Sequence, residues 1–244
     1  MPWYKEWFES PLHDLLYKHR DEEEAYAFIT ALKNTLEPTQ GSNILDLACG
    51  NGRHSVALSK FGKVHGVDLS EKQIGKAKER NIPNAEFFIH DMRKVVKENH
   101  FHYIFNLFSS FGYFEDQIEN QKVLDSVCLS LKSKGIFIQD YLNSEHVSKN
   151  LIAKDDVLTG DYIFRIERKI ENNFVVKQIN VFQSITEEPV GVFFEKVRMY
   201  SKSELEAMHT QAGLQILNVF GNYDLNHFDM TNSPRLILIS QKIK

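Results

Sequence analysis

Cysteine is scarce in this sequence: Cys49 and Cys128 are the only two among 244 residues. Two cysteines cannot form the disulfide framework of a small secreted domain, and a chain of this length buries enough apolar surface without one. Long apolar runs are also missing, since no stretch approaches the ~18 uninterrupted apolar residues of a membrane helix. Residues 1–6 lack the basic-then-apolar pattern of a signal peptide. The sequence therefore predicts a cytoplasmic protein that does not contact a membrane.

An excess of basic charge is missing too. The chain has 29 Lys and Arg side chains against 33 Asp and Glu, for a net charge of −4. This balance lacks the basic footprint of a nucleic-acid-binding protein. The 6 prolines are scattered, and neither an internal repeat nor a Pro/Gly/Ser-rich linker is present. We therefore expect one continuous globular unit with a single insertion.

The main pattern is an alternation of strands and helices. Short apolar runs predict strands at residues 43–48, 63–68, 85–90, 102–108 and 135–141, with helices between them. Near-continuous apolar strands that alternate with helices indicate a parallel sheet covered by helices on both faces. The fold class is therefore α/β, with a Rossmann-like sheet.

The two ends of the chain flank this core. Residues 14–33 carry an imperfect helical stripe, which Pro38 ends, and residues 1–40 are expected to form a helical lid. Near the C-terminus, residues 201–244 predict a helix and two strands that complete the sheet at seven strands. Two helix starts match capping boxes: Ser70 with Gln73, and the run 203–206 (SELE).

The pattern changes to a period of two between about residues 161 and 200. Turns at Asn172–Asn173 and at residues 187–189 divide this segment into strands. We expect an antiparallel β-meander at residues 151–200, inserted after a core at residues 41–150. It could cover the site or pair with a second copy of the chain across a two-fold axis, forming a homodimer.

The most informative segment is a loop with closely spaced glycines, Gly50 and Gly52, between a strand and a helix. Such a loop lets a ligand approach the backbone. Asp46 at its entrance opposes a diphosphate, and Ser55 replaces the third glycine of the dinucleotide fingerprint. Asp68, at the end of the second strand, matches an acid that binds ribose hydroxyls. These features predict an adenosine cofactor with an ammonium and a sulfonium in place of phosphates.

From about Ile44 to Leu142 the chain resembles the class I S-adenosylmethionine-dependent methyltransferases. The resemblance is closest to bacterial small-molecule members with an N-terminal lid and an antiparallel insert. It implies cofactor contacts from the glycine loop (Asp46, Ala48, Gly50, Gly52), from the second and third strands (Asp68, Leu69, Asp91, Met92), from Asn106 on the fourth, and from Tyr17 and Arg20 in the lid.

Methyl transfer depends mainly on holding the acceptor in line with the methyl group, so a dedicated base is optional. Two candidates for a catalytic role are His54 and Tyr113, although a histidine on the first turn of a helix is more often a packing or surface residue. Candidates for substrate binding are Phe108, Tyr113, Phe114, Asn143, Arg198 and Tyr200. Core packing is the alternative for the aromatic residues. Arg235 could bind an acidic acceptor or be a solvated charge.

Several other functions are disfavoured. The histidines lack the spacing of a metal site, so no metal is expected, and Cys49 has no histidine partner that would make it a nucleophile. The segment 106–109 (NLFS) lacks the prolines typical of enzymes that methylate nucleic-acid bases. The leading interpretation is a small-molecule methyltransferase. The alternatives are a non-catalytic module that binds S-adenosylmethionine and a nicotinamide-dependent oxidoreductase.

Overall fold

The structure, a computed structural model, describes residues 2–18, 22–36, 38 and 41–243. Its elements follow the order expected for an α/β protein with an insertion. In chain order they are α1 (Trp3–Glu9), α2 (Pro11–Leu16), α3 (Glu22–Leu36), β1 (Ser42–Leu47), α4 (Arg53–Leu58), β2 (Gly62–Asp68), α5 (Glu71–Glu79), β3 (Ala85–Ile89), β4 (Phe101–Asn106), α6 (Gln117–Ser130), β5 (Leu131–Leu142), α7 (Ser144–Asn150), β6 (Lys154–Thr159), β7 (Tyr162–Glu171), β8 (Phe174–Gln183), β9 (Pro189–Arg198), α8 (Lys202–Gln211), β10 (Leu214–Phe220) and β11 (Arg235–Lys242).

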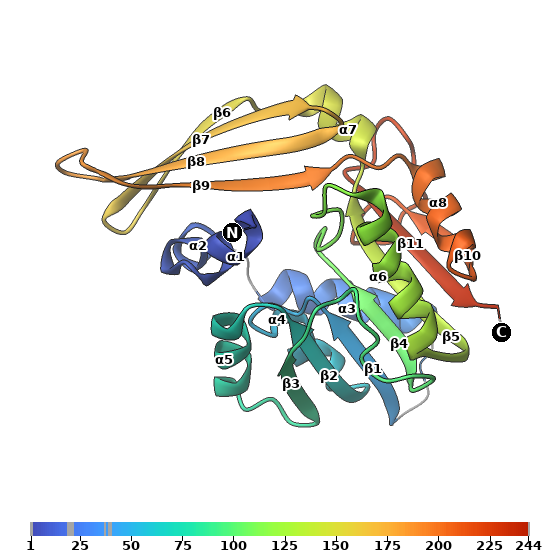
Figure 1. Ribbon diagram of the computed structural model, residues 1–244. Helices are drawn as coiled ribbons and strands as arrows, with labels where there is room; N and C mark the ends of the chain where they lie inside the picture. Colours follow the sequence, from blue (N-terminus) through green and yellow to red (C-terminus); the bar gives the residue numbers. More distant parts are fainter. Residues whose placement is uncertain (1, 19–21, 37, 39–40, 244) are drawn as a thin grey trace.

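Within the described chain, a seven-stranded sheet has the order β10-β11-β5-β4-β1-β2-β3 (Figure 1). Strands β1 to β5 are parallel to one another, and β11 is antiparallel to both β5 and β10. The order of the strands switches between β1 and β4, which lie side by side: the chain builds the sheet from β1 towards β3 and then from β4 towards β5. This is the place where open α/β sheets bind ligands. The predicted fold class, an α/β Rossmann-like sheet with an antiparallel insert, is confirmed.

Helices bury both faces of this sheet. On one face, α6 and α8 pack side chains such as Leu124 and Leu205 against the strands. On the other face, α3 and α4 pack side chains such as Phe28 and Leu58. Because both faces are covered, the central strands have few polar positions, which explains their continuous apolar runs.

A second sheet, of four strands within the described chain, has the order β6-β7-β8-β9 and is antiparallel throughout. We call these four strands the insert, and α1 and α2 the lid helices. Figure 1 shows the insert as a long twisted arm above the lid helices, which lie between it and the core sheet. The contact is apolar: Trp7 and Leu16 of the lid helices pack with Phe164, Ile179 and other buried residues of the insert.

The structure differs from the expected helix at residues 14–33. Helix α2 ends at Leu16, where Tyr17 is the C-cap residue with φ −102° and ψ 16°, and α3 begins at Glu22. Ser10 and Pro11 open α2, because the Ser10 hydroxyl accepts from the amide of Leu12 and proline suits the first helical position. The apolar stripe therefore belongs to two helices that bury different surfaces.

Two helix starts differ from the expectation, and two elements were not expected. Helix α8 has its capping box at Ser201 and Glu204, two residues before the run that was expected to supply it. Helix α5 has half of the expected box, since Ser70 accepts from the amide of Gln73 but the Gln73 side chain donates to the lid. The sequence also did not predict α7 or β6.

Candidate active site

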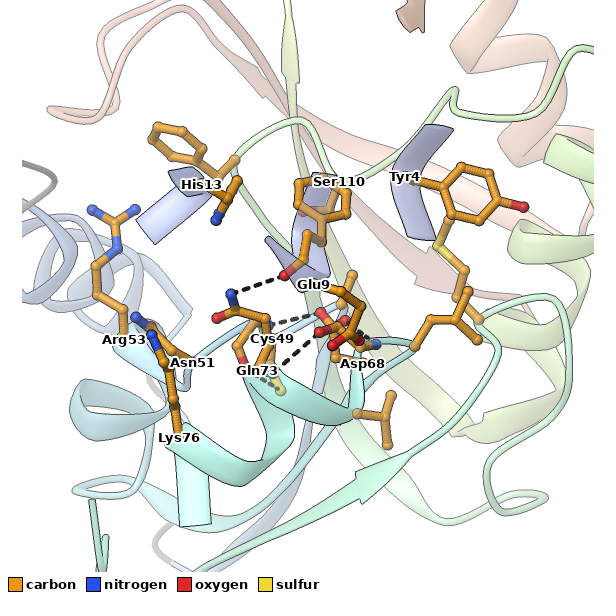
Figure 2. A pocket seen from close by; sticks show the side chains of 18 of the residues that line it. Tyr4, Glu9, His13, Cys49, Asn51, Arg53, Asp68, Gln73, Lys76 and Ser110 are labelled. Atoms are coloured by element: carbon orange, nitrogen blue, oxygen red, sulfur yellow. Dashed lines mark hydrogen bonds between the residues drawn. The ribbon is translucent and has the colours of Figure 1, made fainter. Parts of the chain in front are cut away.

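A cavity of about 820 Å³ lies at the carboxyl ends of β1, β2 and β4, beneath the lid helices (Figure 2). Its position is the ligand-binding position of open α/β sheets. The walls include lid residues (Tyr4, Phe8, Glu9, His13, Asp14, Tyr17), the glycine loop and the start of α4 (Ala48, Cys49, Gly50, Asn51, Arg53, His54), the segments after β2 and β3 (Asp68, Leu69, Asp91, Met92) and the segment after β4 (Leu107, Phe108, Tyr113, Phe114).

The glycine loop turns sharply and presents its backbone to the cavity. Ala48, Gly50 and Gly52 all have positive φ values, of 60°, 54° and 79°. Glycine adopts this conformation without the steric cost that a side chain adds. A Cβ at Gly50 would have no heavy atom within 4 Å, so there is open space beside this residue. The loop therefore forms an open cradle for a ligand.

Asp68 fixes this cradle to the end of β2. Its Oδ2 accepts from the amide of Gly50 at 2.9 Å, and its Oδ1 accepts from the amide of Ser70 at 2.9 Å. Each carboxylate oxygen has a second lone pair, so the group can also accept from two hydroxyls of a ligand. Burial raises the pKa of Asp68, whereas the two amide hydrogen bonds favour its ionised form. Figure 2 shows Glu9 of the lid opposite this carboxylate.

Asp46 does not face the cavity, contrary to the expectation. Its side chain is buried, and its Oδ2 accepts from the Ser55 hydroxyl at 2.6 Å. Burial raises the pKa of Asp46 to about 6. Ser55 therefore has a structural partner, and the argument that Asp46 selects a cationic ligand is not supported. Asp68 and Glu9 are among the acids that do line the cavity.

Two other expected cofactor residues lie outside the cavity wall. A Cβ at Gly52 would lie 3.2 Å from the Phe87 ring, so Gly52 serves close packing beneath the loop. Asn106 is fully buried, and its Nδ2 donates to the carbonyls of Leu47 at 3.0 Å and Ser110 at 3.1 Å. It thus joins β1 to the loop after β4. Arg20 lies outside the described residues.

Asp91 and Met92 line the cavity on the β3 side, as expected. The Arg93 guanidinium donates from Nε and Nη2 to the Asp91 carboxylate, at 3.0 and 2.6 Å. These hydrogen bonds lower the pKa of Asp91, so its carboxylate is ionised near neutral pH. The Arg93 guanidinium also lies 4.6 Å from the centre of the Phe114 ring. Asp91 and the aromatic wall are therefore held together by one arginine.

Aromatic side chains form the wall after β4. Tyr113 contacts Trp3 and Phe8 of the lid, with ring centres 5.1 and 6.0 Å apart. Phe114 contacts Tyr4 with ring centres 5.9 Å apart. This wall therefore closes against α1. Tyr113 and Phe114, two of the candidates for substrate binding, both line the cavity.

His54 lines the cavity at the start of α4. Burial, with a smaller contribution from the neighbouring Arg53 charge, lowers the pKa of His54 to about 3. The ring is therefore neutral at physiological pH, and a neutral imidazole can accept a hydrogen bond at one nitrogen. It is too weak a base to hold a proton taken from an alkylammonium group.

Three expected substrate-binding residues are placed elsewhere. Asn143 caps α7 and donates to the carbonyls of Met230 and Ser233 at 2.9 and 2.8 Å. Tyr200 is fully buried in the core. Arg198 joins the end of β9 to the loop after β4, because its amide donates to the carbonyl of Gly112 at 2.8 Å and its side-chain Nη1 donates to the carbonyl of Glu115 at 3.3 Å. Each of these side chains has a structural environment outside the cavity wall.

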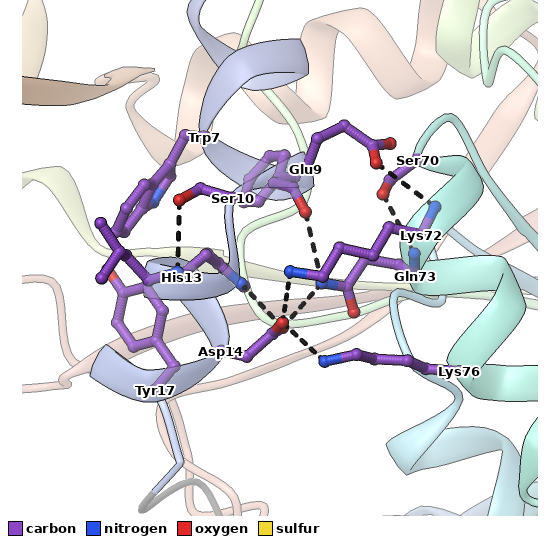
Figure 3. Close-up of polar contacts among 12 residues, drawn as sticks. Trp7, Glu9, Ser10, His13, Asp14, Tyr17, Ser70, Lys72, Gln73 and Lys76 are labelled. Carbon is purple, nitrogen blue, oxygen red and sulfur yellow. Dashed lines mark hydrogen bonds and ion pairs between the residues drawn. The ribbon is translucent and has the colours of Figure 1, made fainter. Parts of the chain in front are cut away.

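Polar contacts that the sequence did not predict hold the lid to α5 (Figure 3). The Asp14 carboxylate forms ion pairs with Lys72 and Lys76 at 2.6 Å and accepts from Gln73 Nε2 at 2.9 Å. Burial opposes ionisation here, but the hydrogen bonds from these three side chains lower the pKa of Asp14 below its usual range. In the sequence, the signal for this contact was the basic and amide side chains of Lys72, Gln73 and Lys76 on α5, which complement an acidic residue of the lid.

The lid is also held to the insert. Trp7 Nε1 donates to Glu195 Oε1 at 2.7 Å, and the Tyr17 hydroxyl donates to the same oxygen. Lys177 donates to the Tyr17 hydroxyl and lies 3.4 Å from the Glu195 carboxylate. Tyr17 lines the cavity, so the insert positions a wall of the site through this polar cluster.

No group of three or more His, Cys, Asp or Glu side chains in residues 2–18, 22–36, 38 and 41–243 is placed to hold a metal ion. None of the helices that the structure describes is long and apolar enough to cross a membrane.

Comparison with known proteins places these features in a family. Residues 38–209 match a family model described as a methyltransferase domain. The chain is 26% identical over 218 residues to the dTDP-3-amino-3,4,6-trideoxy-alpha-D-glucopyranose N,N-dimethyltransferase of Streptomyces venezuelae, covering 84% of this chain and 89% of that protein.

Solved structures share the fold over nearly the whole chain. An S-adenosylmethionine-dependent methyltransferase from Clostridium acetobutylicum has a TM-score of 0.78 and 21% identity, covering 93% of this chain and 94% of its own. CalS10, an amino pentose methyltransferase from Micromonospora echinaspora with S-adenosylmethionine bound, has a TM-score of 0.72 and 15% identity, covering 96% and 97%.

Proposed function

This chain belongs to the methyltransferase-domain family and is an S-adenosylmethionine-dependent methyltransferase of small molecules, and we propose that it methylates the amino group of a sugar. The proposal takes its acceptor class from the dTDP-amino sugar in the name of the Streptomyces venezuelae relative. The observation that carries it is the cavity wall, which sets His54 and the Arg53 guanidinium beside the aromatic residues after β4, with Arg53 5.0 Å from the centre of the Phe108 ring.

The residues of the cavity fit the cofactor. The open space at Gly50 accommodates a bulky ligand group, and the Asp68 carboxylate has lone pairs free for ribose hydroxyls. Leu69 and Met92 offer apolar contacts for the adenine, and Asp91 offers an acceptor for its amino group. When bound, the cofactor supplies a methyl group on a positively charged sulfur.

The acceptor end requires orientation more than acid–base chemistry. An amine attacks through its lone pair, so it has to be bound without its extra proton. The Arg53 guanidinium, which also lines the cavity, favours this form, because a positive charge nearby disfavours a second one. His54 is neutral and adds no negative charge that would hold the extra proton, and its Nε2 lies 3.5 Å from Arg53 Nη2. Phe108 and Tyr113 exclude water and restrict the approach of the amine. The proton released after methylation passes to water.

The test compares matched acceptors with the purified chain. We expect S-adenosylhomocysteine to form with dTDP-3-amino-3,4,6-trideoxyglucose and mass spectrometry to show methyl groups on its nitrogen. The same sugar with a hydroxyl in place of the amine, and a peptide with a free N-terminus, are the controls. Methylation of the hydroxyl sugar or of the peptide in preference to the amino sugar would contradict the proposal. Binding of S-adenosylhomocysteine with no turnover on any acceptor would favour a non-catalytic module.

We also propose that the chain forms a homodimer through the outer face of the insert. Val190, Val192 and Phe194 alternate along β9 and are exposed, on the face opposite to Glu195, which contacts the lid. Exposed apolar residues on a sheet often mark an interface. We expect light scattering to give twice the chain mass and Val192→Glu to give a monomer, with Glu188→Gln as the control. A wild-type monomer at high concentration would exclude this interface.

A further inference from the structure

The loop after β4 has an unusual backbone. Phe108 and Ser109 are consecutive, and both have positive φ values, of 62° and 58°. Residues with a Cβ rarely adopt this conformation, and two in succession persist only where the surrounding structure fixes them. Phe108 lines the cavity, so whatever fixes this backbone also determines where the cavity wall lies.

Asp140, at the end of β5, holds both residues. It is 1% exposed, its Oδ2 accepts from the amide of Phe108 at 2.8 Å, and its carbonyl accepts from the amide of Ser109 at 2.9 Å. A bare buried carboxylate would be unfavourable, and Arg235 at the start of β11 pairs with it. Arg235 Nε donates to Asp140 Oδ1 at 2.8 Å, and Nη2 donates to the Ser109 hydroxyl at 2.9 Å.

The Phe108 ring is held as well as its backbone. The Arg53 guanidinium, at the start of α4, lies 5.0 Å from the ring centre, and the Arg235 guanidinium lies 5.8 Å from it. Arg53 lines the cavity, whereas Asp140 and Arg235 do not. Asp140, which is buried, and Arg235, which is partly buried, therefore reach the cavity only through the loop that they hold.

We propose that Asp140 and Arg235 are positioning residues for methyl transfer, which hold Phe108 as the wall that orients the acceptor. This inference rests on the proposed function, because it assumes an acceptor beside Phe108. It explains why a charge pair joins β5 and β11 next to the site. It also gives Arg235 a different role from the acceptor binding that the sequence suggested.

The main variants are Asp140→Asn, which removes the negative charge, and Arg235→Lys, which keeps the positive charge but loses the planar guanidinium that contacts Asp140 and Ser109 at once. Hydrogen exchange at the amides of residues 107–110, monitored by mass spectrometry, reports the loop directly. We expect faster exchange there in both variants. The dissociation constant for S-adenosylhomocysteine should stay within about threefold of wild type, while kcat with the dTDP-amino sugar falls by about 10- to 100-fold.

A rescue experiment separates positioning from general stability. Ser109→Gly suits the positive φ, so adding it to Asp140→Asn should restore part of the exchange protection and of kcat. Ser109→Ala removes the same hydroxyl without favouring the backbone conformation, so it should restore neither. Asp155→Asn, at an ion pair with Arg168 on the insert, controls for the loss of one acidic charge.

The possible outcomes distinguish this inference from the proposed function. Unchanged exchange at residues 107–110 in Asp140→Asn and Arg235→Lys would overturn it, as would equal rescue by Ser109→Gly and Ser109→Ala. Loss of S-adenosylhomocysteine binding in proportion to kcat would also overturn it, because the residues would then support the cofactor.

If Asp140→Asn does not fold, Arg235→Lys provides the same test. If wild type methylates no amino sugar, the acceptor class fails, and the exchange and rescue measurements still decide the role of Asp140.

Discussion

At the residue scale, Asp68 makes the most direct prediction. Asp68→Asn keeps the size of the side chain but replaces one acceptor oxygen by an NH2 donor. The two oxygens of Asp68 accept from the amides of Gly50 and Ser70, so the variant loses the acceptor for one of these amides. Loss of one or two hydrogen bonds to a charged group corresponds to a loss of about 10- to 1,000-fold in affinity. Titration calorimetry with S-adenosylhomocysteine measures this loss. Glu86→Gln, on the neighbouring strand β3, is the control, and equal affinities in both variants would contradict the role of Asp68.

The two acids at strand ends show what a sequence can and cannot predict. Asp46 and Asp68 both precede a turn after a strand, and Asp68, which was expected at the cofactor site, lines the cavity. Asp46 was placed there too, but its side chain faces the Ser55 hydroxyl in the interior. Whether a side chain at the end of a strand faces the cavity or a helix depends on the local turn and packing, which adjacent residues in the sequence do not determine.

His54 predicts an unusual dependence of rate on pH. Its pKa is lowered to about 3, so its neutral form persists throughout the range in which the enzyme can be assayed. We expect kcat/KM for the amino sugar to rise with pH as the acceptor loses its proton, without an inflection near 6.5. His54→Gln, which retains a hydrogen-bond acceptor, should keep the shape of the profile. An inflection near 6.5 in wild type that disappears in His54→Gln would show that His54 titrates as a base.

At the element scale, the contact between the lid and α5 can be tested through Asp14. Asp14→Asn removes the ion pairs with Lys72 and Lys76 but keeps an acceptor for Gln73. Because these contacts close the lid over the cavity, we expect faster dissociation of S-adenosylhomocysteine, by several-fold in stopped-flow measurements. The wild-type rate should also depend on ionic strength more than the rate of the variant.

A matched control for Asp14→Asn in the lid helices is Glu6→Gln, which removes one exposed negative charge from α1. It should leave the dissociation rate and its salt dependence unchanged. If Asp14→Asn also left both unchanged, the ion pairs would be incidental to ligand retention. Closure of the lid would then depend on its apolar packing against the insert.

Secondary structure was predictable where local pattern and packing agree. Strands such as β1 and β2 are short apolar runs that end at glycine-bearing or acidic turns, and they were predicted to within a residue or two. Strand β6 was missed because Lys154, Asp155 and Asp156 have low strand propensity. Their conformation comes from pairing with β7, which a local pattern does not reveal.

At the scale of the whole molecule, the site is assembled from three parts that are distant in the sequence. The core sheet supplies the glycine loop and Asp68, the lid supplies Tyr17, and the insert holds Tyr17 through Glu195. The hydrogen bond from Trp7 to Glu195 joins residues 188 positions apart. The sequence predicted a lid and a meander, but the attachment of one to the other depends on these long-range contacts. The insert thus acts on the cavity indirectly, by supporting the lid.

Buried titratable groups predict how the stability of the whole fold depends on pH. His209 is buried between Gln139 and Ser240, and burial lowers its pKa to about 3, as it does for His54. An unfolded chain has histidine pKa values near 6.5, so below that pH it takes up protons that the folded chain does not. The stability contributed by each neutral histidine is therefore complete above pH 6.5 and is lost as the pH falls towards 3.

Asp46 acts in the opposite direction over part of this range. Its pKa is raised to about 6 from an unfolded value near 3.8, so between these values the folded chain takes up a proton and is stabilised as the pH falls. At pH 5 each of the two histidines costs up to about 2 kcal/mol relative to pH 7, and Asp46 offsets about 1 kcal/mol of this. Together these three groups lower the free energy of unfolding by about 2–3 kcal/mol between pH 7 and pH 5.

Urea denaturation at pH 7 and pH 5 measures this loss. His209→Gln removes one of the two histidine contributions, so we expect it to reduce the pH dependence by up to about 2 kcal/mol, even if the variant is less stable at both pH values. The same substitution at the exposed His227 is the control and should leave the dependence unchanged. A wild-type protein that is equally stable at pH 5 and pH 7 would show that His54 and His209 gain protons in the folded state. Neutral His54 at the acceptor end of the cavity would then lose its support, which links the stability measurement to the proposed chemistry.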